Sequence, residues 1–316
     1  MGKIYIAMAT YNGARYIKSQ IESIQRQTVE DWVLIIQDDG SKDDTLKIVE
    51  EMRGEDPRIE VIINETQNHG AFANFYTLIK KIKDGVFGND YSYIALSDQD
   101  DIWHENKLEE QIQLIKTIDT QPALVYGNYR IIDENNTVVM NNANDQIGMV
   151  PSSPYALFFA NAYVWGNTVV FNKKLMEELD ISDESITSGY PHDAYLAKVA
   201  TLIGVIKFNE ETLIDYRRFS DNVSSTMWYR LSLLDFLKKL NPSVRSKTLG
   251  VTLDQDLLIL DKYKTNKGEE LKNIIRTGGL KGIFYLRKNR IYRKQVLRNL
   301  SLYIVFLSGI YKKWIR

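Results

Sequence analysis

The N-terminal part of the chain alternates short apolar runs with longer segments of helical periodicity. Four uninterrupted runs have the length and the aliphatic and aromatic content of buried strands: Ile4–Met8, Trp32–Ile36, Ile59–Ile63 and Tyr91–Leu96. Strands that are apolar on both faces and alternate with helices are typical of a parallel sheet covered by helices on both sides. The pattern therefore predicts an α/β protein with a mostly parallel sheet.

Polar loops follow all four of these runs. The loops are Thr10–Asn12, Asp38–Asp39, Asn68–Gly70 and Asp98–Asp101. Functional loops of a parallel sheet gather at the C-terminal ends of its strands. Four polar loops at one edge of one sheet therefore predict a binding site there.

The last of these loops carries three carboxylates within four residues, beginning with Asp98. In an extended segment the side chains of Asp98 and Asp100 point the same way, so the pair can hold a hard cation and leave room for phosphate oxygens. The alternative is that these acids favour the N-terminal end of a helix predicted at Lys107–Lys116. An EF-hand loop is excluded, because its fifth and sixth positions would be Ile102 and Trp103.

Other common site chemistries are missing from the sequence. The chain has no Cys, so a disulfide framework and a thiolate metal site are excluded. Neither glycine-rich phosphate loop occurs, because there is no GxGxxG after the first apolar run and no GxxxxGK[ST]. A nucleotide on this sheet would need its phosphates held in another way, and a cation at Asp98 and Asp100 is the candidate.

The second part of the chain is less regular. We expect strands at Ala123–Tyr126, Tyr129–Ile132, Thr137–Met140, Tyr163–Phe171, Gly204–Phe208 and Thr212–Tyr216. Asp133–Asn136 is typical of a hairpin turn, and an apolar helix is expected to begin at Pro191–Asp193. After Ser225 the pattern is helical to the end of the chain.

Charge is distributed unevenly along the chain. Residues 271–316 contain 12 Lys and Arg and no acid, which leaves 28 of the 40 basic residues against 41 Asp and Glu, a net charge of -13. Apolar helices with basic flanks favour docking on an anionic membrane surface, although Leu300–Tyr311 is shorter than the about 20 residues that span a bilayer. The alternative is a helical module that packs on the body and has a basic outer face. The acidic body argues against nucleic acid as a partner.

Five short motifs occur in order along the chain: Ala9–Asn12 (ATYN), Gln37–Ser41 (QDDGS), Ser97–Trp103 (SDQDDIW), His192–Asp193 (HD) and Tyr216–Ser225 (YRRFSDNVSS). Together they resemble the inverting nucleotide-sugar transferases of glycosyltransferase family 2. In more detail they are similar to bacterial rhamnosyltransferases that build cell-wall and capsular polysaccharides. The resemblance covers roughly residues 3–225 and implies the GT-A fold, a Rossmann-like sheet with helices on both faces, followed by a C-terminal helical module.

The resemblance implies a domain plan and an activity. Residues 1–225 would form the catalytic domain, with a nucleotide-binding half at 1–101 and an acceptor half at 102–225, and residues 226–316 a basic helical module. The implied reaction moves a sugar, rhamnose as the first expectation, from a dTDP- or UDP-linked donor to a polyprenyl-linked cell-surface saccharide. Such an enzyme is expected at the cytoplasmic face of a bacterial inner membrane. The oligomeric state is left open.

The resemblance also implies roles for individual residues. The donor-side residues would be Thr10, Tyr11, Asn12, Asp38, Asp39, Asp98, Gln99 and Arg217. Among them, Asp39 would accept a hydrogen bond from N3–H of uracil or thymine, and Asp38 would lie near the ribose. Asp100, with Asp98, would bind Mg²⁺ or Mn²⁺ at the diphosphate, and Asp193 would be the general base. The acceptor side would carry Trp165, Gly166 and His192.

The same residues have plainer interpretations. Asn12–Gly13 and Asp39–Gly40 are common turn dipeptides. Asp193 can cap the helix that starts there, and Gly166 can mark a bend in a strand. Each plain interpretation is at least as good for its own residue, but the five motifs in order favour the site.

One position departs from the family pattern. Related rhamnosyltransferases often have YRQH where this chain has Tyr216–Phe219. A His there could be a further metal ligand, and Phe219 cannot replace it. Either Asp100, the diphosphate and water hold the metal, or Arg217 or Arg218 takes part of the charge of the leaving group.

Three other functions compete with the rhamnosyltransferase. The same chemistry can use a UDP-hexose donor. A catalytically silent protein that binds nucleotide sugars could share the fold, although the full set of Asp39, Asp98, Asp100 and Asp193 argues against it. A metal-dependent phosphohydrolase would be expected to show more metal ligands than this chain offers.

Overall fold

The computed structural model of the chain describes residues 2–147, 153–159, 164–187, 189–218, 242–292 and 296–316. The strands in these ranges are β1 (Lys3–Thr10), β2 (Trp32–Asp38), β3 (Ile59–Ile63), β4 (Tyr91–Ser97), β5 (Ile102–Trp103), β6 (Ala123–Ile132), β7 (Val138–Met140), β8 (Val170–Asn172) and β9 (Val205–Arg217). The α-helices are α1 (Ile17–Gln25), α2 (Thr45–Glu55), α3 (Ala71–Lys83), α4 (Lys107–Lys116), α5 (Ala143–Ile147), α6 (Lys173–Glu178), α7 (Glu184–Thr187), α8 (His192–Ile203), α10 (Pro242–Lys262), α11 (Asn266–Thr277), α12 (Gly279–Lys288) and α13 (Val296–Ser308). Short 3-10 helices are η1 (Pro154–Phe158), η2 (Gly166–Thr168) and η4 (Ile310–Trp314).

Internal packing divides the chain into two compact units. Unit 1 contains residues 1–143, 164–196 and 204–222, and unit 2 contains residues 144–163, 197–203 and 223–316. Two segments within the expected catalytic domain, 144–163 and 197–203, therefore group with the C-terminal helices. The functional boundary expected at residue 225 stays a prediction.

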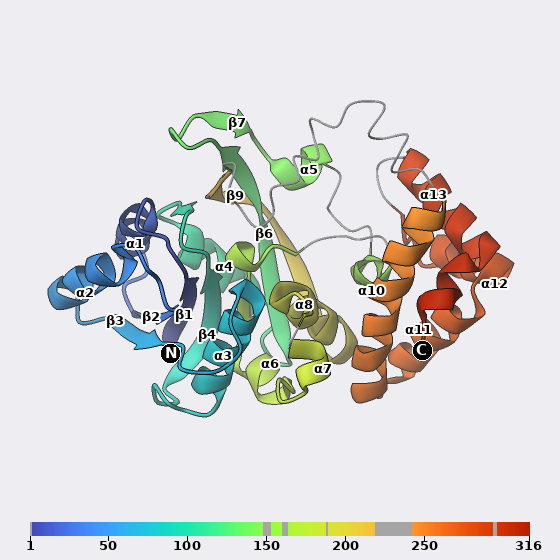
Figure 1. The fold of residues 1–316 in the computed structure, drawn as a ribbon, viewed down its shortest axis with the longest axis horizontal. Helices are drawn as coiled ribbons and strands as arrows, with labels where there is room; N and C mark the ends of the chain where they lie inside the picture. Colours follow the sequence, from blue (N-terminus) through green and yellow to red (C-terminus); the bar gives the residue numbers. More distant parts are fainter. Residues whose placement is uncertain (1, 148–152, 160–163, 188, 219–241, 293–295) are drawn as a thin grey trace. The chain divides into compact units, whose positions relative to one another are not determined.

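Unit 1 is built on one mixed sheet with the strand order β3-β2-β1-β4-β8-β6-β9-β5, and β7 pairs with β6 (Figure 1). The four strands at one end, β3-β2-β1-β4, are all parallel. The connections through α1 and α2 step one way along this order, and the connection through α3 steps back across it. Because such crossovers are right-handed, α1 and α2 cover one face and α3 covers the other. This half of the sheet confirms the prediction from the apolar runs.

The other half of the sheet is mixed rather than parallel. β8 is antiparallel to both β4 and β6, while β9 runs parallel to β6. The hairpin turn expected at Asp133–Asn136 is confirmed, because the Asp133 N–H donates to the Thr137 carbonyl at 2.9 Å and β7 returns along β6. The sheet therefore changes direction at β8, where the chain leaves the parallel pattern.

Three strand predictions in this half were wrong in extent. The two strands expected at Ala123–Tyr126 and Tyr129–Ile132 are one strand, β6. The segment expected as a strand around Gly166 is instead the 3-10 helix η2, and only Val170–Asn172 pairs as β8. The two short strands expected near the end of unit 1 are one long strand, β9. The pairing of β9 with β6 shifts register next to Asn128. This bulge accommodates the polar residues of β9 that made the segment look like two strands.

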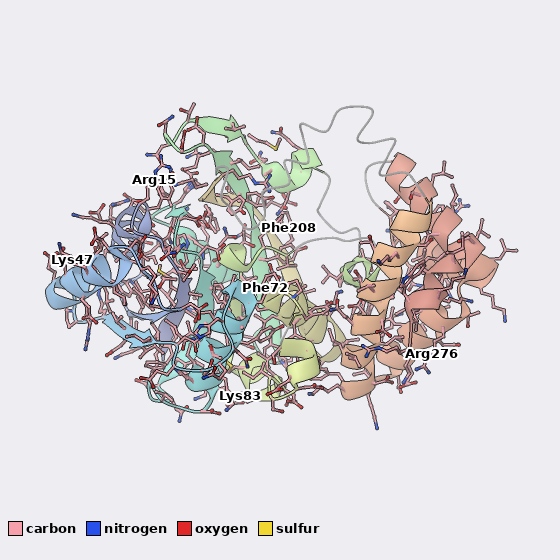
Figure 2. All side chains as sticks on the ribbon, in the orientation of Figure 1. Arg15, Lys47, Phe72, Lys83, Phe208 and Arg276 are labelled. Carbon is pink, nitrogen blue, oxygen red and sulfur yellow. The ribbon has the colours of Figure 1, made fainter. Side chains whose placement is uncertain are left out.

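A long side chain ties two helices of unit 1 together. The Lys83 ammonium, labelled in Figure 2, donates to the carbonyls of Met176, Glu177 and Leu179 at 3.1, 2.8 and 2.5 Å. These carbonyls lie at the C-terminal end of α6, where carbonyls have no partner within the helix. Lys83 thus caps α6 from the end of α3.

Unit 2 consists of the C-terminal helices, with η1 and the second part of α8. A buried ion pair joins Lys198 of α8 to Asp256 of α10, with Nζ and Oδ1 2.6 Å apart. The Phe306 ring on α13 contacts the rings of Phe159 and Tyr311, with centroids 5.8 and 5.1 Å apart. In the parts of the chain that the structure describes, no helix combines the length and the apolar character required to cross a bilayer.

The packing between β6 and β9 generates a stability prediction. A Cβ added at Gly204 would lie 2.0 Å from the Pro122 carbonyl oxygen, a backbone atom that cannot move freely. Gly204→Ala should therefore lower the free energy of unfolding by about 1–3 kcal/mol. Urea unfolding measures it. Gly54→Ala is the matched control, since Gly54 lies in α2 with open space around it, and this change should stabilise by up to about 1 kcal/mol. Equal effects of the two changes would contradict the packing argument.

Candidate active site at the carboxyl edge of the sheet

The register of the parallel strands brings the polar loops together. Thr10 at the end of β1 lies beside Asp38 at the end of β2, and Asp38 lies beside Ile63 at the end of β3. Met8 lies beside Ser97 at the end of β4. The four loops therefore leave the sheet at one edge, as the sequence predicted.

Asp38 organises the turn that follows β2. Its side chain is fully buried and accepts four hydrogen bonds: from the N–H groups of Gly40 and Ser41 at 2.9 and 2.8 Å, and from the hydroxyls of Thr10 and Ser41 at 3.0 and 2.5 Å. A carboxylate has about four acceptor positions. The structure thus gives Asp38 a positioning role at the place where contact with the ribose was expected.

The first loop is held open toward solvent at Tyr11. Asn12 adopts a left-handed conformation with φ 48°, its N–H donates to the Ser41 hydroxyl at 2.8 Å, and its side-chain oxygen accepts from the Lys42 N–H at 2.8 Å. The turn expected at Asn12–Gly13 is therefore present. Tyr11 is 53% exposed, so its ring is available to a ligand.

Gln99 connects this loop to the loop after β4. Its side-chain oxygen accepts from the Tyr11 N–H at 2.9 Å, and its side-chain nitrogen donates to the Tyr11 carbonyl at 3.0 Å. A Cβ at Gly13 would lie 2.3 Å from the Gln99 side-chain oxygen, so glycine is required for this approach. Gln99 thus bonds to the backbone of the loop rather than standing free for a donor.

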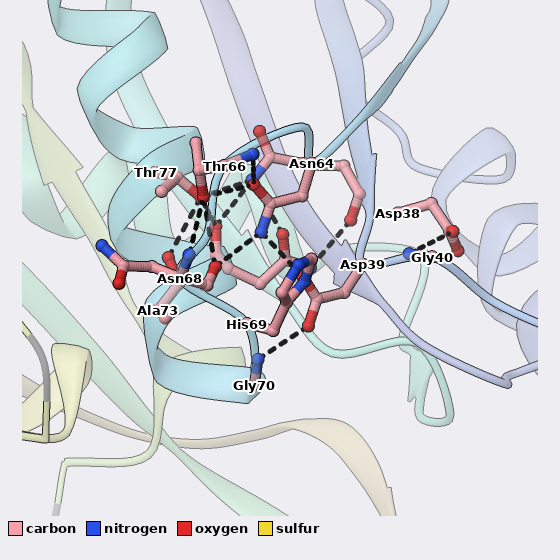
Figure 3. Close-up of polar contacts among 12 residues, drawn as sticks. Asp38, Asp39, Gly40, Asn64, Thr66, Asn68, His69, Gly70, Ala73 and Thr77 are labelled. Carbon is pink, nitrogen blue, oxygen red and sulfur yellow. Dashed lines mark hydrogen bonds and ion pairs between the residues drawn. The ribbon is translucent and has the colours of Figure 1, made fainter.

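Asp39 is held by three donors from the segment after β3 (Figure 3). Oδ1 accepts from Asn64 Nδ2 at 2.7 Å and from His69 Nδ1 at 2.8 Å, and Oδ2 accepts from the Gly70 N–H at 2.7 Å. We call Asn64, His69 and Gly70 the Asp39 clamp. The sequence placed Asn68–Gly70 at this edge but assigned no role to Asn64 or His69.

Asp98 lies near both Asp100 and Asp193. Burial raises the pKa of Asp98, and the charges of Asp100 and Asp193 raise it further. Burial also raises the pKa of Asp100, and the nearby Arg217 charge lowers it in part. Asp193 comes from the start of α8, so the fold brings three carboxylates from two distant segments into one site.

The oxygens of Asp98 and Asp100 fit a hard divalent cation. No side chain among the described residues donates a hydrogen bond to either carboxylate, and both groups carry like charge that a cation would offset. In the described ranges no group of three His, Cys, Asp or Glu is arranged to hold a metal by itself. The site therefore suits a cation that takes its remaining ligands from a phosphate and water. Phe219, at the position of the expected third ligand, lies outside the described residues.

The residues beneath this loop form a buried polar network. Asp101 is fully buried and accepts from Asn167 Nδ2 and from the Arg217 N–H. The Arg217 guanidinium, 2% exposed as a residue, donates from Nε to the Asp100 carbonyl at 2.9 Å and packs over the Tyr16 ring at 4.4 Å. Arg217 thus positions the Asp100 backbone, and direct contact with a donor stays a prediction.

A buried lysine completes this support. Lys107 is fully buried, its Nζ lies 3.6 Å from the centre of the Trp103 ring, and it donates to Gln111 at 2.9 Å. Burial lowers the pKa of Lys107, and the Asp101 charge raises it in part. The helix predicted at Lys107–Lys116 is confirmed as α4, and its N-cap residue is Asn106, so none of the three acids caps it directly. The partners Asn167 and Lys107 could not be found from local sequence, because they meet Asp101 only in the fold.

His192 packs beside Asp193 under the rim of the site. Its ring stacks on Phe75 with centroids 4.0 Å apart, and a Cβ at Gly166 would lie 2.9 Å from His192 Nε2. The imidazole ring of His192 therefore occupies the space that a side chain at position 166 would need. Burial lowers the pKa of His192 to about 3, so the ring is neutral at physiological pH. Asp193 lies in the first turn of α8, and its Oδ1 accepts from the Ala194 N–H at 2.6 Å, so it bonds to the free amide end of the helix as the plainer interpretation expects. Its role as the general base stays a prediction.

Trp165 lies in an aromatic cluster on the same side as Gly166. Its ring centroid is 6.0 Å from that of Tyr129 and 5.9 Å from that of Tyr216. The acceptor-side role expected for Trp165, Gly166 and His192 stays a prediction. Gly166 and His192 lie beside Asp193, and Trp165 contacts Tyr216 of β9, the strand that ends at Arg217.

Comparison with known proteins agrees with this arrangement. A sequence model of glycosyl transferase family 2 matches residues 5–179, more than half of the 316 residues. The chain is a member of this family. The family 2 chain is 30% identical over 255 residues to the Escherichia coli UDP-Glc:alpha-D-GlcNAc-diphosphoundecaprenol beta-1,3-glucosyltransferase WfgD, covering 77% of this chain and 88% of WfgD.

Two further relatives are informative. The dTDP-rhamnosyl transferase RfbG of Shigella flexneri is 41% identical over 109 residues, which cover 34% of this chain and 36% of RfbG. The glycosyltransferase RP339 of Rickettsia prowazekii is 28% identical over 243 residues, which cover 75% of this chain and 72% of that protein. The stronger identity is therefore confined to a shorter shared segment.

Solved structures confirm the GT-A fold of this glycosyltransferase. TarS of S. aureus, residues 1–349 in complex with UDP, matches with a TM-score of 0.53 and 16% identity over 97% of this chain and 92% of that one. The mannosyltransferase PcManGT from Pyrobaculum calidifontis, in complex with GDP-Man and Mn²⁺, matches with a TM-score of 0.51 and 13% identity over 98% of this chain and 86% of that one. Both likenesses concern the fold alone.

The carboxylate cluster of this family 2 glycosyltransferase predicts a pH-dependent stability. The ordinary pKa of Asp is about 3.9, and the folded protein raises that of Asp98 to about 7 and that of Asp100 to about 6. Raised acid pKa values favour the folded state at low pH, and this contribution is lost as the pH rises through the folded values. Asp100→Asn should therefore raise the free energy of unfolding at pH 8 in EDTA, by an amount on the order of 1 kcal/mol, and have less effect near pH 4.

The matched control for this prediction is Asp38→Asn, an equally small change in a neighbouring loop. Asp38 accepts four hydrogen bonds, so its loss should lower the free energy of unfolding by about 1–3 kcal/mol at pH 8. Urea titrations at both pH values measure the two variants. An Asp100→Asn protein less stable than the wild type at pH 8 would show that the cluster carries no repulsion.

Proposed function

We propose that the enzyme transfers a sugar from a nucleoside diphosphate donor to a saccharide acceptor in one inverting step, with Asp193 as the general base. The observation that carries the proposal is the position of Asp193, whose charge raises the pKa of Asp98 although the two residues are far apart in sequence. A base beside the carboxylates proposed to face the diphosphate would stand next to the anomeric carbon. No residue is required as a covalent nucleophile.

The proposed step balances as a direct displacement. The acceptor oxygen forms a bond to the anomeric carbon, and the bond from that carbon to the diphosphate oxygen breaks. The acceptor proton passes to the Asp193 carboxylate, and the bonding pair leaves with the nucleoside diphosphate. Asp98 and Asp100 would hold Mg²⁺ or Mn²⁺, which when bound offsets negative charge on the diphosphate.

The other residues of the edge then serve binding and orientation. Tyr11, 53% exposed, and the backbone of Thr10–Asn12 would lie against the nucleoside. Asp39 would accept from the base. The Arg217 guanidinium already donates to the Asp100 carbonyl. This favours a metal held by Asp100, the diphosphate and water over an Arg217 that takes part of the charge of the leaving group. His192, neutral and buried, would shape the acceptor side next to Asp193.

The two functional relatives bear on the donor and acceptor. RfbG is a dTDP-rhamnosyl transferase, and its similarity supports rhamnose as the sugar. WfgD uses UDP-Glc and a diphosphoundecaprenol-linked acceptor, and its longer match keeps a UDP-hexose donor as the alternative. The name of WfgD supports a lipid-linked acceptor. The proposed place of action is the cytoplasmic face of the bacterial inner membrane.

The proposed function is tested on Asp193. Asp193→Asn should lower the transfer rate by about 10²–10⁴-fold, because proton removal is lost, while donor affinity stays unchanged. Transfer is measured with dTDP-rhamnose and UDP-glucose on a polyprenyl-linked acceptor, and affinity by calorimetry, each with Mn²⁺ and with EDTA. Asp90→Asn, on an exposed loop before β4, is the matched control and should leave both unchanged.

Two results would contradict this assignment. If Asp193→Asn lost donor affinity but kept its turnover, Asp193 would be a binding residue and not the base. If the wild-type protein bound donors but transferred no sugar to any acceptor and hydrolysed none, the silent nucleotide-sugar-binding protein would be the better description.

The C-terminal helices support docking on an anionic membrane. In unit 2, Leu280 and Phe284 on α12 are 77% and 70% exposed, and Leu300, Ile304 and Leu307 on α13 are 52%, 44% and 52% exposed. Spacings of four and three residues put the members of each set on one face of their helix. Residues 271–316 carry 12 Lys and Arg and no acid. Exposed apolar faces within a purely basic segment fit an anionic lipid surface.

Vesicle binding tests the membrane surface. The double variant Leu280→Ser, Phe284→Ser should reduce co-sedimentation with phosphatidylglycerol-containing vesicles by at least about tenfold, because two large apolar side chains no longer enter the interface. Val138→Ser, Val139→Ser is the control, since these side chains are 43% and 40% exposed on β7 of unit 1. Equal binding to neutral phosphatidylcholine vesicles, or no binding by the wild type, would favour the packed-module alternative.

A further inference from the structure

The Asp39 clamp leaves little of the Asp39 carboxylate free. Oδ1 accepts two hydrogen bonds, from Asn64 Nδ2 and His69 Nδ1, and Oδ2 accepts one, from the Gly70 N–H. An ionised carboxylate offers about four acceptor positions, two on each oxygen. Among the residues that the structure describes, no other donor reaches Asp39, so one position remains, and it lies on Oδ2.

The clamp is itself fixed by the fold. Asn64 Nδ2 also donates to the Asn68 carbonyl at 2.9 Å, and Asn64 Oδ1 accepts from the Thr66 hydroxyl at 2.8 Å. Gly70 has φ 102°, a conformation that favours glycine, and it directs its N–H at Oδ2 from the start of α3. The three donors are thus held in place before any ligand arrives, and only His69 has a largely exposed side chain, at 55%.

We infer that the Asp39 clamp selects the donor nucleotide by allowing Asp39 to accept one base N–H and no second one, which favours uracil or thymine over guanine. The inference rests on the proposed function, in which Asp39 faces the base. It assigns a specificity role to His69 and Asn64, which act by occupying Oδ1 rather than by touching the base.

The chemistry of the bases gives the selection its direction. Uracil and thymine each present a single imide N–H, at N3, which the free position on Oδ2 can accept. Guanine presents two neighbouring N–H donors, at N1 and at the amino group on C2. A carboxylate that accepts both needs a free position on each oxygen, and Oδ1 has none. One guanine donor would be left unpaired, and an unpaired buried donor costs about tenfold or more in affinity.

Ring size must be separated from donor count, and hypoxanthine does this. Hypoxanthine is a purine of the same shape as guanine but lacks the amino group, so its edge has one N–H. If donor count decides, inosine diphosphate should bind better than guanosine diphosphate, although both are purine nucleotides. If ring size decides, the two should bind equally weakly.

The experiment is calorimetry of the full chain with UDP, dTDP, IDP and GDP, all in Mn²⁺. We expect UDP or dTDP to bind tightest, and IDP to bind at least about fivefold more tightly than GDP. The same series is run on His69→Phe, which keeps a ring but removes the N–H and frees one position on Oδ1. The IDP-to-GDP ratio should then fall toward one. Asn68→Ala, a side-chain change in the same loop outside the clamp, should keep the wild-type ratio.

The outcomes separate this inference from the proposed function. Binding of GDP as tight as that of IDP and UDP by the wild type overturns the inference and leaves a nucleotide-sugar transferase in place. An unchanged IDP-to-GDP ratio in His69→Phe overturns the role of His69. No binding of any of the four nucleotides overturns the proposed function, and the inference with it.

Discussion

Repulsion between like charges is the constraint on which this structure depends. The parallel strands deliver carboxylates from separate loops to one edge of the sheet, and α8 adds Asp193 to them. Burial and proximity raise the pKa values of Asp98 and Asp100, which means that the folded chain holds these charges at a cost in stability. A site that is costly to the empty protein is prepared to bind positive charge. This is how a fold with few metal ligands of its own can still favour a cation.

The carboxylates of the edge differ in what surrounds them. Asp38 has four donors, Asp39 has three, and Asp98 and Asp100 receive none from the described side chains. The number of donors therefore separates three roles: Asp38 fixes a turn, Asp39 is a selective acceptor, and Asp98 and Asp100 keep open oxygens. Asp101 resembles Asp38, because its buried carboxylate accepts hydrogen bonds from Asn167 Nδ2 and from the Arg217 N–H. The role of each Asp is set by its neighbours.

The sequence predicted the parallel half of the sheet well, because continuous apolar runs such as Trp32–Ile36 report burial on both faces. It also placed Asp38, Asp39, Asp98 and Asp100 at one edge, since parallel strands share a direction. It failed where structure depends on contacts between distant segments. The 3-10 helix at Gly166 arises where the His192 ring packs against the glycine, and no local pattern shows that contact. Asn64 was missed for the same reason, since a lone polar residue after a strand has no local signal.

The two hydrogen bonds between Gln99 and the backbone of Tyr11 have a thermodynamic consequence. They join the loop that carries Asp98 and Asp100 to the loop that leads into the turn at Asn12, so restricting one loop reduces the freedom of the other. Entropy lost when a first ligand orders the pair need not be lost again by a second. Such coupling is reciprocal, so each ligand changes the affinity for the other by the same factor. A single amide side chain thereby joins the two loops, and ligands bound at each are expected to be coupled.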